Sequence, residues 1–165
     1  MSDQPRAHTI ELPQPVVFNF TCFGSARWAL DYLAAAKHFP IADRFSPVPY
    51  FLYCQALELG LKAFLLLKGV PKNELKDEFR HDLVKLLASA KQFGFDKYVG
   101  IAADEESAVG MVNTPYKNRQ LQYIDVGWAG RAFKGLPPLE TLAAFVERVV
   151  SDETLQDLYL HNEDA

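Results

Sequence analysis

One stretch constrains the fold of this chain more than any other, the run PYFLYCQALELGLKAFLLLKG from Pro49 to Gly69. Its apolar residues go almost all the way round a wheel of 3.6 residues per turn. A helix with that pattern lies in the middle of a bundle, with neighbours on most sides. We therefore expect a core helix over Pro49–Gly69, with Gly69 as its C-terminal cap.

The polar residues of this helix form one narrow stripe. Gln55, Glu58 and Lys62 stand at i, i+3 and i+7, so they share a face of the helix. Burying a carboxylate and an ammonium costs roughly several kcal/mol unless the two charges are paired. Two interpretations stay open. The stripe lines a ligand cleft, or Glu58 and Lys62 form an i,i+4 ion pair on a solvent-facing strip, worth about a few tenths of a kcal/mol.

Four further segments have helical periodicity, and together with the core helix they predict an all-α fold, an antiparallel bundle of about five helices. They are Ser25–Phe39 with Ser25 as N-cap, His81–Gly94 with Asp82 in its first turn, Asp104–Tyr123 with a kink or break at Thr114-Pro115, and Leu139–Leu160 with a bend near Ser151-Asp152. Residues 8–23 and 122–136 are predicted to form short extended strap or hairpin segments. The charged connector 70–80 is predicted to face solvent.

The length of 165 residues fits a single domain. Within it we expect an extended N-terminal strap over 1–24, the bundle core over 25–150, and the end of the last helix with a polar tail over 151–165. The net charge of −4, with no long block of Lys or Arg, does not favour sequence-blind binding to a nucleic-acid backbone. Any contact with nucleic acid is therefore expected to be local.

The sequence also bears on the cellular location of the protein. The run Tyr50–Leu67 approaches membrane-spanning length, but Glu58 and Lys62 near its centre would each cost roughly several kcal/mol in lipid. We expect no membrane association. The N-terminus has no basic segment followed by an apolar one, so no secretory signal is expected and the protein is predicted to be cytoplasmic.

Neither metal chemistry nor a cofactor is predicted. The histidines at 8, 38, 81 and 161 are scattered, and none has a His or Cys at helical ligand spacing. Cys22 and Cys54 stand alone, without a CxxC motif, and are expected to be buried thiols.

Arg119 is the best candidate for recognising an anion. Tyr116, Arg119 and Tyr123 stand at i, i+3 and i+7, so they share one face of the predicted fourth helix. A guanidinium forks onto a phosphate or carboxylate, and neighbouring rings can stack on a base. In the alternative interpretation, an Arg and Tyr cluster holds the fourth helix to the core helix through Glu58.

His81 has two interpretations as well. It is a functional side chain at the start of the third helix, or it caps that helix or satisfies a core carbonyl. Asp82 is predicted to complement the helix dipole rather than to act in catalysis.

The order of these motifs resembles the HEPN superfamily, over roughly Ser25 to Val150. The motifs are Glu58 and Lys62 in ExxxK, His81-Asp82-Leu83 opening the next helix, and Arg119 with Tyr123 in a later one. The resemblance implies a compact helical bundle that forms a homodimer, with a cleft at or near the interface. It also implies either ribonuclease activity or the binding of a nucleotide or another small ligand.

The chain departs from the catalytic pattern of that family, an Arg followed four to six residues later by a His. Residues Gln120 to Asp125 after Arg119 contain no histidine, and His81 directly follows Arg80. We therefore predict a non-catalytic HEPN-like module that binds a nucleotide or RNA, as part of a toxin-antitoxin or phage-defence system, with a nucleotidyltransferase-type antitoxin as a candidate partner. The predicted ligand-binding residues are Glu58, Lys62, His81, Tyr116, Arg119 and Tyr123.

Two alternatives stay open. The first is a divergent metal-independent ribonuclease, in which His81 is the general acid or base and Arg119 stabilises the phosphorane. The second is a dimerisation scaffold without a ligand, in which the polar stripe is an interface network of salt bridges.

Overall fold

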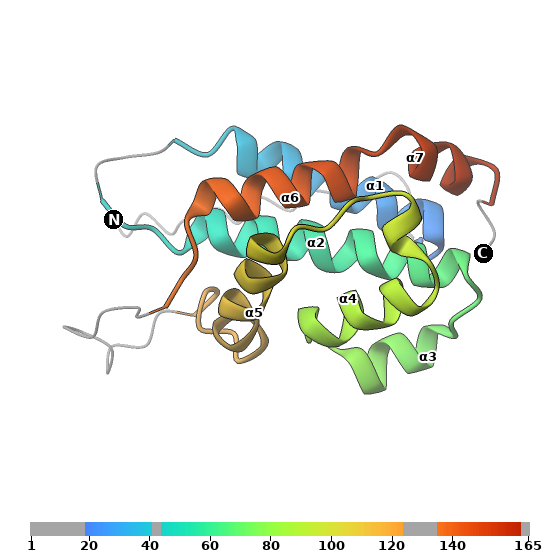
Figure 1. Ribbon diagram of the computed structural model, residues 1–165, viewed down its shortest axis with the longest axis horizontal. Coiled ribbons are helices and arrows are strands. Elements are labelled where there is room, and N and C mark those ends of the chain that lie inside the picture. The colour runs from blue at the N-terminus through green and yellow to red at the C-terminus, as the bar shows by residue number, and fades with distance from the viewer. Residues whose placement is uncertain (1–18, 41–43, 124–134, 163–165) are drawn as a thin grey trace, which may run out of the picture.

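The computed structural model describes residues 19–40, 44–123 and 135–162, and none of these residues lies in a β-strand. The elements are α1 (Cys22–Lys37), α2 (Val48–Leu67), α3 (Lys72–Glu74), the π-helical turn η1 (Leu75–Phe79), α4 (Leu83–Gln92), the 3-10 turn η2 (Phe95–Lys97), α5 (Ala103–Lys117), α6 (Leu139–Ser151) and α7 (Glu153–Leu160) (Figure 1). The helices pack together around one core, which confirms the predicted all-α bundle.

The helix α2 is the centre of that bundle, as predicted. α1 runs antiparallel along it, α6 also packs along it, and in the view of Figure 1 α4 and α5 lie on the side of α2 opposite α6. α6 comes close enough that a Cβ added at Gly60 would lie 3.3 Å from Val150 Cγ2. Glycine at this position therefore allows α6 to lie directly against the central helix.

The ends of α2 follow from its sequence. Pro49 lies in the first turn, where proline loses no helical hydrogen bond. At the other end Gly69 adopts φ +83°, the Val70 N–H donates to the Leu65 carbonyl and the Gly69 N–H donates to the Leu66 carbonyl. This is a Schellman motif, so the predicted cap at Gly69 is confirmed.

By length and composition alone, α2 could also cross a membrane, and among the described residues it is the helix that passes this test. Inside the bundle 72% of its most apolar window is buried. That degree of burial is what the core helix of a globular bundle shows.

The first helix begins earlier than predicted. Thr21, not Ser25, is the N-cap, because its Oγ1 accepts a hydrogen bond from the Gly24 N–H at 3.1 Å. Ser25 lies buried inside the helix. The predicted strap 8–23 is thus wrong at Cys22 and Phe23, which are helical, and its residues up to 18 lie outside the described residues.

The connector 70–80 is also more ordered than predicted. It forms α3 and η1, and although most of its charged side chains face solvent, Leu75 is fully buried in the core. The expectation of a solvent-facing loop is therefore wrong for Leu75 and for Val70, because both apolar side chains are buried and anchor the connector to the bundle.

The later helices differ at their ends. The third predicted helix begins at Leu83 with Asp82 as its N-cap, rather than at His81. α5 contains Pro115 and ends at Lys117, so it stops six residues short of Tyr123. The bend predicted near Ser151-Asp152 is confirmed, since Asp152 is extended and caps α7 by accepting the Leu155 N–H at 2.9 Å.

The second predicted strap or hairpin, 122–136, falls for the most part outside the described residues. Only its edges, Gln122, Tyr123, Gly135 and Leu136, are described, and none of them lies in a strand.

Candidate functional site

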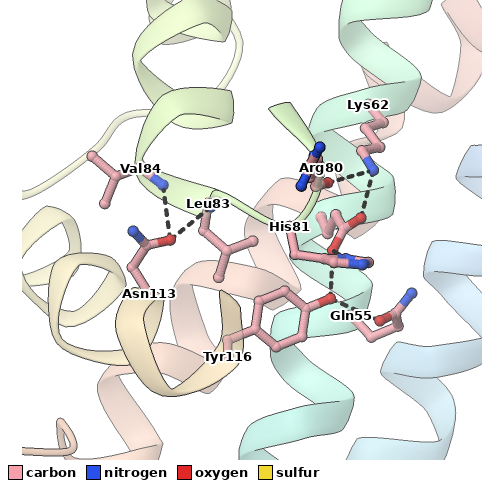
Figure 2. Close-up of polar contacts among 9 residues, drawn as sticks. Gln55, Lys62, Arg80, His81, Leu83, Val84, Asn113 and Tyr116 are labelled. Carbon is pink, nitrogen blue, oxygen red and sulfur yellow. Dashed lines mark hydrogen bonds and ion pairs between the residues drawn. The ribbon is translucent and has the colours of Figure 1, made fainter. Parts of the chain in front are cut away.

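A buried carboxylate is the centre of the candidate site. Glu58, on α2, is only 2% exposed, and its two oxygens accept three hydrogen bonds. Lys62 Nζ donates to Oε1 at 2.5 Å, while the Tyr116 hydroxyl and His81 Nδ1 bond Oε2 at 2.5 and 2.9 Å. Figure 2 shows Lys62, His81 and Tyr116 converging from three parts of the chain. Glu58 and Lys62 thus form the predicted i,i+4 ion pair, but the pair is buried, so its expected position on a solvent-facing strip is wrong.

The hydrogen-bond partners of Glu58 determine whether its carboxyl group is ionised. Burial alone would raise the pKa of Glu58, but the hydrogen bonds from His81, Lys62 and Tyr116 and the charge of Lys62 outweigh it and hold the pKa below its ordinary value. Burial and the neighbouring Glu58 charge raise the pKa of Tyr116. The phenol therefore stays protonated, and its O–H donates a hydrogen bond to the ionised carboxylate of Glu58.

Gln55 completes the polar stripe of α2. Its side-chain Oε1 lies 2.7 Å from the Tyr116 hydroxyl, next to the contact with Glu58. All three members of the stripe, Gln55, Glu58 and Lys62, thus have partners within the chain, as the cost of burying polar groups requires.

Lys62 also connects α2 to the turn before α4. Its Nζ donates to the Arg80 carbonyl at 2.8 Å in addition to its bond with Glu58 (Figure 2). Together with the His81–Glu58 contact, this fixes two consecutive residues of the turn against the central helix.

A second network holds the same turn from the side of α5. Asp82 Oδ1 accepts the Lys85 N–H at 3.1 Å, and its Oδ2 accepts from Lys117 Nζ at 2.6 Å. Asn113 donates to Asp82 through Nδ2. Its Oδ1 accepts the Leu83 N–H at 2.8 Å, as Figure 2 shows. Asn113 of α5 and the N-cap Asp82 therefore together satisfy free N–H groups at the start of α4. Asp82 therefore acts at the N-terminal end of α4, as predicted.

The pKa of Asp82 follows the same logic. Burial alone would raise it, but the hydrogen bonds from Lys117, the Lys85 backbone and Asn113 outweigh that effect and hold the pKa below its ordinary value.

A cleft of about 670 Å³ opens beside these networks. Its wall carries the cations Lys62, Lys76, Arg80, Lys117 and Arg119, against the carboxylate of Asp77. His81 and the aromatic ring of Phe20 also line it. A concave surface lined by cations raises the local concentration of anions.

Three of these cations are not held by an ion pair. Lys62 is bound to Glu58 and Lys117 to Asp82, whereas Lys76, Arg80 and Arg119 have no carboxylate within salt-bridge distance among the described residues. Their charge is therefore available to an anion in the cleft.

The predicted site residues are brought together to different degrees. Lys62, His81 and Arg119 line the cleft, and Glu58 and Tyr116 lie behind them. His81 and Arg119 also share a small adjoining pocket with Gln55 and Tyr116. The alternative in which His81 caps α4 is not found, because Asp82 is the N-cap of that helix.

Tyr123 does not share the face predicted for it. The helix ends at Lys117 and Arg119 adopts φ +59°, so the i, i+3, i+7 pattern does not continue to Tyr123, which is 58% exposed. The alternative in which the Arg and Tyr cluster holds the fourth helix to the core helix through Glu58 is found for its tyrosine, Tyr116, whereas no contact between Arg119 and Glu58 is found among the described residues.

Sequence reasoning did not identify several residues of the site. The sequence places Lys76 and Arg80 in a connector that is predicted to face solvent, and Lys117 and Asn113 belong to no motif. The one sequence signal for these residues is that Arg80 is a cation directly before His81.

Other chemistry has little support in the described part of the chain. No group of three or more His, Cys, Asp or Glu side chains there is arranged to hold a metal ion. Cys22 and Cys54 are both buried, as predicted. Burial raises the pKa of the Cys54 thiol, which makes it a poor nucleophile.

Comparison with protein-family models, with curated proteins and with solved structures finds no match for this chain.

Proposed function

We propose that this protein is a HEPN-like, non-catalytic module that binds a nucleotide or an RNA end in the cleft beside His81. The observation that carries the proposal is the gathering of five cationic side chains at one cleft of a protein whose net charge is −4. Local cations in an acidic protein favour a small anionic ligand over a long nucleic-acid backbone.

The cleft also offers a surface for a base. Phe20 lies at its wall and packs in part against the core. Stacking on an aromatic ring contributes about 1–3 kcal/mol per base in single-stranded nucleic-acid sites. A phosphate at Lys76 and Arg119 with a base on Phe20 is the arrangement that we propose.

The binding test uses fluorescence anisotropy with a labelled single-stranded RNA, at about 50 mM and about 200 mM salt. Arg119→Ala and Lys76→Ala each remove one cation of the cleft, and each is expected to weaken binding by about tenfold and to lower the salt dependence. Lys97→Ala is the matched control, because Lys97 is an exposed lysine outside the cleft lining. Equal affinity of all four proteins, or no binding at the lower salt, would contradict the proposal.

A second candidate function, metal-independent RNA cleavage, is favoured by one observation. His81 and Arg119 line the same cleft, and Glu58 holds the Nδ1 side of the imidazole, which leaves the other ring nitrogen as the one for proton transfer. In this alternative His81 takes the proton of an RNA 2′-hydroxyl or gives one to the leaving oxygen, and Arg119 stabilises the phosphorane.

The two functions separate in one assay. Purified protein is incubated with total RNA and transfer RNA in EDTA, and wild type is compared with His81→Ala and Arg119→Ala on a denaturing gel. Intact RNA in all lanes favours the binding module. Cleavage by wild type that both substitutions abolish establishes the ribonuclease.

The scaffold alternative has less support, because Lys62 uses its hydrogen bonds within its own chain. We retain the homodimer, the toxin-antitoxin or phage-defence context, the nucleotidyltransferase-type partner and the cytoplasmic location as parts of the proposal that rest on the HEPN resemblance. Light scattering of the purified protein tests the first of these directly.

A further inference from the structure

The turn that carries His81 contains a residue type that its backbone disfavours. The Asp82 N–H donates to the Phe79 carbonyl at 2.8 Å, which closes a four-residue turn. Its first central residue, Arg80, has φ +48° and ψ −112°. These angles belong to a type II′ turn, in which this position is dominated by glycine. An arginine there is strained.

A second arginine with positive φ lines the same cleft. Among the described residues, Arg80 and Arg119 are the non-glycine residues with positive φ, and both are at the wall of the 670 Å³ cleft. Strained backbone persists where the surroundings enforce it, and it is concentrated at ligand sites.

The surroundings of Arg80 enforce its backbone without help from its side chain. Lys62 holds the Arg80 carbonyl, Glu58 holds His81, and Lys117 holds Asp82. Arg80 is exposed, and its guanidinium makes one long hydrogen bond among the described residues, from Nε to the Asp77 carbonyl at 3.3 Å. The fold therefore gains little from an arginine at this position, where a glycine would fit without strain.

We infer that Arg80 is a ligand-binding residue, and that with Arg119 it grips a phosphate monoester, the group shared by a free nucleotide and the 5′ end of an RNA. This inference rests on the proposed function and specifies its ligand. A monoester carries a charge of about −1.5 to −2 at pH 7, more than an internal phosphodiester. Two forked guanidinium groups and the unpaired Lys76 match that charge and its three terminal oxygens.

The strain is tested by comparing two substitutions that both remove the guanidinium. At an ordinary position a Gly variant is less stable than an Ala variant, because glycine gives the unfolded chain more freedom. At Arg80 the order reverses, and Arg80→Gly melts at a higher temperature than Arg80→Ala. Lys97→Gly and Lys97→Ala are the control pair, with the ordinary order expected. A lower melting temperature for Arg80→Gly than for Arg80→Ala would show that the backbone at this position is not strained.

The ligand is tested with two RNA oligonucleotides of one sequence, one with a 5′-phosphate and one with a 5′-hydroxyl. Wild type is expected to bind the phosphorylated RNA about tenfold more tightly. Arg80→Gly and Arg80→Ala lose most of this preference, and Arg80→Lys, which keeps a cation on the same backbone, retains part of it. An unchanged preference in Arg80→Gly overturns the inference.

Competition distinguishes the two sources of the monoester. Displacement of the phosphorylated RNA by AMP but not by adenosine assigns the site to a free nucleotide. Persistence of the 5′-phosphate preference without displacement by AMP assigns it to an RNA end. If Arg119→Ala weakens RNA binding and Arg80→Gly does not, the proposed function stands and this inference fails. Absence of any binding by wild type refutes both.

Discussion

The hydroxyl of Tyr116 donates to Glu58 Oε2 across 2.5 Å, and this contact joins α5 to the central helix α2. The same carboxylate oxygen bonds His81, whose ring meets the Tyr116 ring edge-on at 6.0 Å between centroids. The wall of the cleft and the core of the bundle therefore share one buried charge. A change at this charge acts on stability and on the position of His81 together.

Removing the Tyr116 hydroxyl tests the effect of this buried charge on stability. Tyr116→Phe keeps the ring contacts with Phe51 and His81 but leaves Glu58 with one donor fewer in a buried setting. The free energy of unfolding is expected to fall by about 1–3 kcal/mol. Urea denaturation measures it. A midpoint equal to that of wild type would show that the hydroxyl is replaceable by water.

The Glu58–Lys62 pair is expected to be strongly coupled. Lys62→Met leaves the buried carboxylate without its charged partner and is expected to lower the free energy of unfolding by about 3–5 kcal/mol. Glu58→Gln removes the charge that Lys62 balances. A double-mutant cycle separates the interaction from the single effects. If the pair is coupled, the double variant loses less than the sum of the two single variants, whereas strict additivity would contradict the coupling.

Stability is expected to fall on acidification through Glu58. Its pKa in the folded protein lies below the ordinary value of 4.5, so near that pH the unfolded carboxyl binds a proton while the folded one stays ionised. The unfolded state then binds more protons, and the free energy of unfolding decreases as the pH falls below about 5. The loss continues until the pH passes the lowered pKa of the folded state.

The check is a series of urea titrations from neutral to acidic pH. Glu58→Gln is expected to be less stable at neutral pH but to lose less on acidification. A residual slope remains in that variant, because the pKa of Asp82 is also lowered by its partners. Parallel pH profiles for wild type and Glu58→Gln would exclude Glu58 as a source of the acid sensitivity.

The bundle and its central helix could be predicted from the sequence because both depend on local patterns. The apolar residues of α2 cover almost the whole wheel, and Gly69 and the Ser151-Asp152 break have recognisable end chemistry. The polar stripe also indicated buried partners correctly, because an ionised pair inside such a helix has no inexpensive alternative.

What sequence reasoning missed depends on contacts between distant segments. Leu75 lies in a charged connector whose few apolar residues show little periodicity, so no pattern marks it as buried. Thr21 follows a β-branched and aromatic run, which masked its role as an N-cap. The positive φ of Arg80 and Arg119 has no sequence signal, because glycine is the residue that marks such positions.

Phe20 provides the test that separates a nucleotide site from a simple phosphate site. Its ring lines the cleft with the cations, so Phe20→Ala removes a stacking surface without removing charge. Binding of AMP is expected to weaken by about tenfold, in line with about 1–3 kcal/mol per stacked base, while inorganic phosphate binds as in wild type. Isothermal titration with both ligands measures the two effects, and the melting temperature shows whether the partly buried ring also supports the core. Equal weakening of AMP and phosphate would mean that Phe20 shapes the cleft rather than stacking on a base.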